Sequence, residues 1–172
     1  MSEQIEGRNA VLEAFRSGKC VDKLFVLDRC QDGPVRTIIR EARKKDTIIN
    51  FVQKERLDQL SEIGAHQGVI AQVAAYEYST VEDILNKAKE KGEAPFIFLL
   101  DDIEDPHNLG AIIRTANLAG AHGVIIPKRH AAGLTSTVAK TSAGALNYTP
   151  VAKVSNLGPV SYTHLTLPTN SL

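Results

Sequence analysis

The stretch Asp101–Ile125, DDIEDPHNLGAIIRTANLAGAHGVI, has the clearest structural pattern in this chain. The apolar run Phe96–Leu100 precedes it, and a second apolar run, Val124–Ile126, overlaps its end. Short apolar runs beside turn residues are typical of buried strands, and the segment between them is long enough for a helix. Six small residues would let another backbone come close to that helix: Gly110, Ala111, Ala116, Ala119, Gly120 and Ala121. The stretch therefore predicts a strand–helix–strand unit of a parallel α/β sheet.

Two polar residues in this unit mark a candidate site. Pro106 pushes Asp105 towards extended backbone and so ends the strand segment. Asn108 stands just before Leu109 and is predicted to be the N-cap of the helix. Arg114 lies on a helix that is otherwise apolar or small, which is a costly place for a guanidinium without a role. Because open α/β sheets carry their sites at the carboxyl ends of strands, Asn108 and Arg114 are the candidate catalytic residues.

Both residues also have a simpler structural explanation. Asn108 could act only as a helix cap, and the two roles can coexist. Arg114 could form a salt bridge instead of serving a site. Four acids just before the helix are candidate partners: Asp101, Asp102, Glu104 and Asp105. The unit would then be an ordinary strand–helix–strand segment.

The pattern DxxxDPxNxGAIxRTAxxAGxxGV in this stretch resembles motif 1 of the SpoU (TrmH-type) RNA 2′-O-ribose methyltransferases, which belong to the trefoil-knotted SPOUT class. The resemblance implies that S-adenosylmethionine donates a methyl group to a ribose 2′-OH. It gives Arg114 the role of activating that hydroxyl and Asn108 the role of positioning the catalytic groups. Since a guanidinium is a poor base at neutral pH, Arg114 could equally stabilise the developing alkoxide or bind the adjacent phosphate.

The charge distribution indicates an anionic partner for the second half of the chain. Net charge is zero, which argues against a strongly basic nucleic-acid binder, but all 20 acids lie at or before Asp105. Five cations and no acids follow: Arg114, Lys128, Arg129, Lys140 and Lys153. Such a segment has a positive local field suited to phosphate, although a chance asymmetry is the alternative. Lys128 and Arg129, in the loop Pro127–Gly133, are predicted to contact RNA phosphates; a solvated turn is the alternative.

The first part of the chain predicts a separate RNA-binding domain. Helices are predicted over residues 7–18, 34–45 and 55–63, and strands over 24–27, 47–52 and 69–75. The segments Gly7–Asn9 and Ala65–Ala71 resemble the small ribosomal-protein-like domain that precedes many of these enzymes. In it, Arg8 and Gln67 are predicted to donate hydrogen bonds to RNA phosphates or base edges, while His66 could instead be a hydrogen-bonded turn histidine. With this domain present, the resemblance is nearest to the subgroup that methylates a guanosine in 23S ribosomal RNA.

The expected fold is α/β: a small α/β RNA-binding domain followed by the first part of a SPOUT parallel-sheet methyltransferase domain. The expected boundaries are 1–78 for the RNA-binding domain, 79–95 for a linker helix and loop, and 96–157 for the methyltransferase part. Thr80 and Asp83 predict a capping box at the start of the linker helix. A further helix is expected over about 134–146 and a last strand over about 151–154. The family pattern stops at Gly158, so residues 158–172 are expected to be an atypical tail of a truncated or read-through chain, with a short natural variant as the alternative.

Other features exclude several classes of site. Cys20 and Cys30 fit no zinc spacing, and the five histidines form no metal-ligand pattern, so no metal is expected. The chain has no apolar run long enough for a membrane span and no signal-peptide core, which favours a reducing cytoplasm. The resemblance implies ribosomal RNA as a partner and a homodimer. A non-catalytic RNA-binding module is the main alternative, and a nucleotide-binding oxidoreductase ranks low because no glycine fingerprint occurs.

We expect calorimetric titration of the 172-residue chain with S-adenosylmethionine to show no binding. The family holds this donor with a Gly-Glu-rich motif and a Ser-Leu-Asn motif, and neither occurs in the sequence. A full-length family member serves as the positive control. An affinity in the micromolar range for the 172-residue chain would contradict the expectation.

Overall fold

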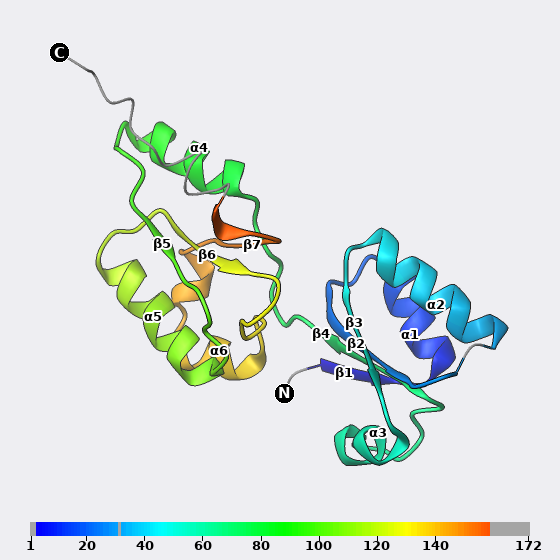
Figure 1. Ribbon diagram of the computed structural model, residues 1–172. Helices are drawn as coiled ribbons and strands as arrows, with labels where there is room; N and C mark the ends of the chain where they lie inside the picture. The colour runs from blue at the N-terminus through cyan, green and yellow to red at the C-terminus, as the bar shows by residue number, and fades with distance from the viewer. Residues whose placement is uncertain (1–2, 31, 159–172) are drawn as a thin grey trace. The chain divides into compact units, whose positions relative to one another are not determined.

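The computed structural model describes residues 3–30 and 32–158. These residues form two compact units, one over residues 1–77 and one that begins at Tyr78. Each unit has its own sheet (Figure 1). Each also has its own apolar core. The tail expected over 158–172 lies outside the described residues except for Gly158.

The first unit contains a four-stranded mixed sheet in the order β1-β4-β2-β3. β4 pairs antiparallel with both β1 and β2, whereas β3 runs parallel to β2 and forms an edge. Its elements are β1 (Glu3–Glu6), α1 (Arg8–Arg16), β2 (Val21–Leu27), α2 (Gly33–Lys44), β3 (Ile48–Val52), α3 (Lys54–Leu60) and β4 (Val69–Val73). The three predicted helices and three predicted strands are confirmed. β1 was not predicted, because a four-residue strand with a single apolar residue has no period to detect.

Helices α1 and α2 pack side by side against one face of this sheet (Figure 1). The alternating burial of β2 shows which face they cover, since Leu24 and Val26 are fully buried between half-buried neighbours. Residues of both helices and of strands β2 and β4 form the core: Val11, Phe15, Leu24, Val26, Val35, Ile38, Ala42, Val69, Ala71 and Val73. The opposite, solvent-facing side of α2 is left free for polar residues.

The second unit contains the predicted parallel sheet, in the order β5-β6-β7. Its elements are α4 (Val81–Lys91), β5 (Ile97–Leu99), α5 (Pro106–Leu118), β6 (Gly123–Pro127), α6 (Ser136–Thr141), the 3-10 turn η1 (Ala145–Asn147) and β7 (Val151–Val154). The helix expected over 134–146 is shorter than predicted. It ends at Thr141, because Ala143 and Gly144 take positive φ angles of 50° and 86° and reverse the chain.

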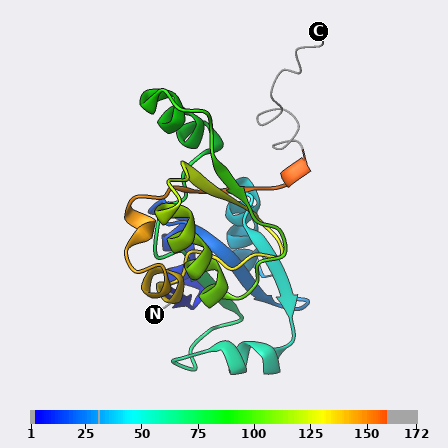
Figure 2. The same cartoon turned by 90° about the vertical axis from the view of Figure 1, so that its left-hand side faces the viewer.

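Both faces of this sheet are covered, which makes the second unit a three-layer structure. α4 lies on one side and α5 with α6 on the other (Figures 1 and 2). Along β6, Ile125 packs towards Ile84 of α4, whereas Val124 and Ile126 belong to the core beneath α5. The predicted capping box starts α4: the Thr80 hydroxyl accepts from Asp83 N at 3.1 Å, and the Asp83 carboxylate accepts from Thr80 N at 2.8 Å.

Gly110 lets α5 and α6 touch. A Cβ at this position would lie 1.8 Å from Thr141 Oγ1 and 3.0 Å from the Val138 carbonyl oxygen, both on α6. The expectation that small residues allow a close backbone approach is confirmed here. The position of α5, and of the polar residues that it carries, therefore depends on the absence of a side chain at Gly110.

Two smaller observations concern the whole described chain. Cys20 is exposed and Cys30 half-buried, and both are free thiols. No helix within the described ranges has the length and apolar character that a membrane crossing requires.

We expect Gly110→Ala to lower the free energy of unfolding by about 1–3 kcal/mol, because the added methyl overpacks the contact with α6. The matched control is Gly33→Ala in α2, where a Cβ meets nothing within 4 Å and φ is not positive. That variant should be neutral or slightly more stable. Urea unfolding followed by circular dichroism measures both, and equal midpoints for the two variants would show that the contact is not tight.

Candidate functional site

Helix α5 begins three residues earlier than the sequence predicted. Asp105 is its N-cap, with extended backbone (φ −82°, ψ 120°), and its carboxylate accepts from His107 N at 2.9 Å. Pro106 is the first helical residue, where its fixed φ fits and its missing N–H leaves nothing unsatisfied. The prediction that Asn108 caps the helix is therefore wrong. Asn108 is the third helical residue, and its exposed side chain makes no hydrogen bond within the described part of the chain.

Arg114 lies on the same helix and is also exposed. None of the described acids lies within ion-pair distance of its guanidinium, so the salt-bridge explanation fails in this structure. Six residues separate Asn108 from Arg114, which corresponds to about 9 Å along the axis and about 120° around it. The two candidate residues thus share a helix but not one face of it.

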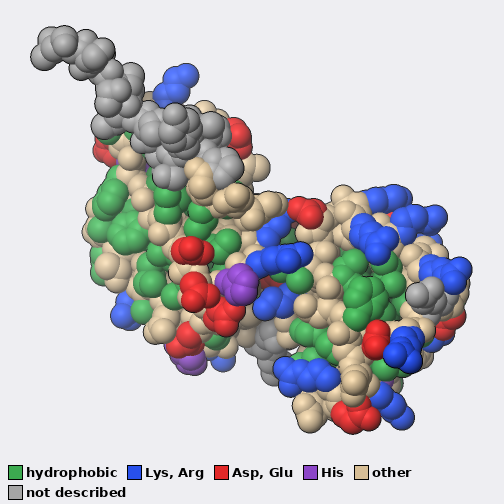
Figure 3. Space-filling model, in the orientation of Figure 1, with side chains coloured by type: hydrophobic (Ala, Val, Ile, Leu, Met, Phe, Trp, Pro, Cys, Tyr) green, Lys and Arg blue, Asp and Glu red, His purple; other side chains and the backbone are tan. Residues whose placement is uncertain are grey.

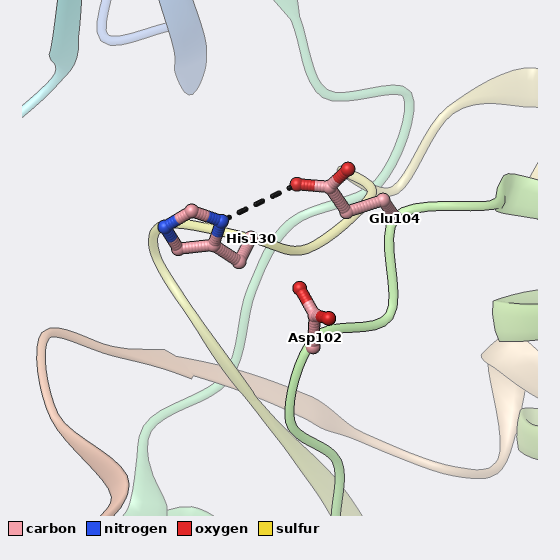
Figure 4. A group of neighbouring side chains, drawn as sticks. All are labelled: Asp102, Glu104 and His130. Carbon is pink, nitrogen blue, oxygen red and sulfur yellow. Dashed lines mark ion pairs between the residues drawn. The ribbon is translucent and has the colours of Figure 1, made fainter.

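The acids that could have paired with Arg114 lie at the ends of strands instead. β5 and β6 are parallel neighbours, and a bridge between Ile103 and Ala131 continues their alignment into the following loops. As a result Asp102, Glu104 and His130 come together (Figure 4), with His130 Nδ1 3.4 Å from a Glu104 carboxylate oxygen. One ligand atom from each lies within 4.8 Å of the others. The sequence did not predict this group, because its members are brought together by strand register and have no motif spacing.

This group is exposed, and exposed acids of this kind are common without a bound ion. Its main effect is electrostatic. Lys128 and Arg129 belong to the same loop as His130, with Lys128 half-buried and Arg129 exposed. The backbone of this loop is held by a bond from Lys128 N to the Val154 carbonyl at 2.8 Å. The purely positive field predicted for this region does not hold at His130, because a Glu104 carboxylate oxygen lies 3.4 Å from its Nδ1.

In the first unit the structure brings Arg8 and Gln67 together. Arg8 Nε donates to the Gln67 carbonyl at 3.1 Å, and Arg8 N donates to Gln67 Oε1 at 3.2 Å. The Arg8 guanidinium also pairs with Asp32 at 2.6 Å, the residue that caps α2. Gln67 has a positive φ of 51° in the turn that follows His66. Both residues therefore have a structural role, and their contact with RNA stays a prediction.

His66 is the hydrogen-bonded turn histidine that the sequence left open. Its Nδ1 accepts from Gly68 N at 3.0 Å, and its Nε2 lies 2.9 Å from Asp58 Oδ1. With Nδ1 as the acceptor, Nε2 carries the proton that faces the carboxylate. This pair fixes the turn on which Gln67 stands.

Comparison with known proteins connects both units to one enzyme family. The family model for RNA 2′-O ribose methyltransferase substrate binding matches residues 4–79. The model of the SpoU rRNA methylase family matches residues 95–162. Together the two models match most of the chain, in the order expected from the sequence.

Individual relatives agree with these matches. A Bacillus subtilis protein assigned by its name to the TrmH family of tRNA/rRNA methyltransferases is 49% identical over 160 residues, which is 91% of this chain and 64% of the relative. A Staphylococcus epidermidis protein of the same family name is 44% identical over 153 residues, 89% of this chain and 61% of the relative. The chain thus spans about three-fifths of the length of these curated relatives.

Solved structures show a weaker likeness. An AdoMet-bound rRNA methyltransferase from Sinorhizobium meliloti has a TM-score of 0.43 and 22% identity, and the match covers 94% of this chain and 57% of that one. The SpoU methyltransferase AviRb from Streptomyces viridochromogenes has a TM-score of 0.42 and 25% identity, with 91% and 55% covered. The family relationship therefore rests on the sequence matches.

We expect Asp105→Ala to cost about 1 kcal/mol of unfolding free energy, because it removes the carboxylate that caps α5. Asn108→Ala should lower the free energy of unfolding by only a few tenths of a kcal/mol, since it removes an exposed side chain that makes no hydrogen bond to a described residue. Urea unfolding of the two variants in parallel measures the difference. A larger loss for Asn108→Ala than for Asp105→Ala would restore Asn108 as the cap.

Proposed function

Because this chain belongs to the SpoU methylase family, we propose that it serves the transfer of a methyl group from S-adenosylmethionine to a ribose 2′-OH of ribosomal RNA. The observation that carries the proposal is the exposed guanidinium of Arg114, which lies on the helix after β5 and has no acidic partner among the described residues. A guanidinium in this state can bind a phosphate or a developing alkoxide with paired N–H donors. The match of residues 4–79 to a substrate-binding model supports RNA as the substrate.

The residues of α5 would handle the RNA side of the reaction. A guanidinium is a poor base at neutral pH, so we assign Arg114 charge stabilisation at the ribose or its phosphate, in preference to proton abstraction. Asn108 has both a donor and an acceptor on its free amide and would orient the ribose. Bound S-adenosylmethionine supplies the methyl group as a sulfonium. The exposed side chains at this end of the sheet fit RNA better than an enclosed adenosyl group, and we assign none of them to the donor.

We further propose a guanosine of the 23S ribosomal RNA as the target and the cytoplasm as the location. The matched methylase model names ribosomal RNA, whereas the relatives are named for both tRNA and rRNA.

We also propose a homodimer. Two large apolar side chains on the second unit support a partner surface there: Leu118, 81% exposed, and Tyr148, 71% exposed. A non-catalytic RNA-binding module is the second candidate, favoured by the match of residues 4–79 to the substrate-binding model.

Arg114→Ala at the matching position of a full-length relative should lower methyl transfer to ribosomal RNA by about 100-fold or more, because one stabiliser of transition-state charge is lost. Incorporation of labelled methyl groups measures transfer, and calorimetry should show unchanged donor binding. Arg114→Lys keeps the positive charge but lacks the paired N–H donors. Its rate of methyl transfer should lie between the rates of the parent enzyme and of Arg114→Ala. Thr115→Ala, which changes an exposed neighbour, is the control. Near-normal turnover in the alanine variant would remove Arg114 from the catalytic site.

A further inference from the structure

We propose that a basic groove on the first unit, between α2 and the edge strand β3, binds an unpaired segment of the RNA substrate. The inference rests on the proposed function for its choice of RNA and extends it to a surface that no motif of the sequence marked. Six residues of the groove carry the argument: Arg29, Arg36, Arg40, Arg43, Lys44 and Phe51. Figure 3 shows Lys and Arg side chains gathered around an apolar area in this region of the unit.

Three of the arginines form a stripe along α2. Arg36, Arg40 and Arg43 are spaced four and three residues apart, which places them on one face of the helix. Like charges at this spacing repel and destabilise the isolated helix. All three side chains are exposed, and no described acid pairs with Arg36 or Arg43. A bound polyanion would relieve this repulsion.

The acids near the groove offset its charge only in part. Glu41 lies between the stripe and Lys44, with its carboxylate 2.9 Å from Lys44 Nζ and 3.7 Å from Arg40 Nε. The hydrogen bond from Lys44 holds the pKa of the Glu41 carboxyl below its ordinary value. Asp28 lies 3.9 Å from Arg29 Nε at the other end. Five cations thus face one lining acid, Asp28, and one shared acid, Glu41.

An aromatic side chain stands at the edge of the groove. Phe51 is paired in register with Val26 of β2, so both side chains point to the face that α1 and α2 cover. Val26 is fully buried under the helices, but Phe51 lies on the edge strand and is 53% exposed. An exposed ring beside a row of cations is the combination by which proteins hold unpaired nucleic acid, with phosphates on the cations and a base stacked on the ring.

The groove is large enough to hold part of an RNA strand, and it leads to the predicted RNA-binding turn. Its volume is about 800 Å³, and Ile39 and Cys30 are also among its lining residues. The Cys30 sulfur lies 4.0 Å from the Arg8 guanidinium, which in turn contacts Gln67. An RNA strand that follows α2 would therefore reach the turn that the sequence singled out.

The test is fluorescence anisotropy of a labelled single-stranded RNA of about 12 nucleotides with the 172-residue chain. The double variant Arg36→Ala/Arg43→Ala should weaken binding at least tenfold at about 50 mM salt. It should also reduce the slope of log affinity against log salt by about 1.4, since each lost contact to single-stranded phosphate removes about 0.7. Phe51→Ala should weaken binding about fivefold or more through lost stacking, whereas Phe51→Tyr should keep it. Glu41→Gln should tighten binding, because it removes the acid shared by Lys44 and Arg40.

The control for charge is Lys54→Ala/Arg56→Ala on α3, which removes the same charge from exposed residues outside the groove. This control variant should bind the RNA with an affinity within about twofold of that of the parent chain. Since every substituted side chain is exposed or half-exposed, circular dichroism and the thermal midpoint should match the parent chain. The readout is RNA binding without a methyl donor, so a failed groove leaves the methyl-transfer proposal standing, and the reverse also holds.

Several outcomes would overturn the proposal. One is the absence of RNA binding by the parent chain, and another is an equal effect of the control pair and the α2 pair. Equal affinity for polyglutamate would identify the groove as a site for an acidic peptide. Equal affinity for an RNA duplex, together with an unaffected Phe51→Ala variant, would exclude an unpaired strand.

Discussion

The contact between α5 and α6 at Gly110 is the constraint on which the second unit depends. One side of α5 presses Leu109 and Ile113 into the sheet, while Gly110 lies directly against Thr141 and Val138. A helix held on two sides has little freedom to shift, because packed interiors resist changes of even a methyl group. The start of α5 and the exposed arginine further along it are therefore held in place by packing that involves neither of them.

The pairing of the parallel strands β5 and β6 determines which charged residues lie close together near that helix. Because β5 and β6 end side by side, the acids that follow β5 meet the loop that follows β6, and Glu104 pairs with His130. Within the described part of the chain, Arg114 is thus left without an acidic partner, although four acids precede its helix in the sequence. An unpaired, exposed guanidinium keeps its donors for a ligand, which is why the geometry favours a phosphate or an alkoxide as its partner.

The arginines of the first unit fall into two groups, one that contacts structural residues and one that lines the groove beside α2. Arg8 pairs with the acid that caps α2 and with the turn at Gln67, so its removal would disturb the fold as well as any RNA contact. On α2, Arg36 and Arg43 form no ion pair with a described acid, and the arginines of this helix line a groove beside an exposed ring. Variants of α2 can therefore separate RNA binding from stability, which variants of Arg8 cannot do.

The sequence by itself determined most helices and strands and the capping box at Thr80, because periodicity, caps and turn residues act over a few neighbouring positions. It also named Asn108 and Arg114 as candidate site residues, and their roles stay a prediction. It missed β1, which has a single apolar residue, and it placed the cap of α5 at Asn108 although Pro106 fits the first helical position better. The tertiary structure alone decided that none of the described acids pairs with Arg114, that His130 lies beside Glu104, and that the arginine stripe of α2 lies beside Phe51. Each of these depends on which strands are neighbours and in what register, and residues far apart in the chain become neighbours only through that pairing.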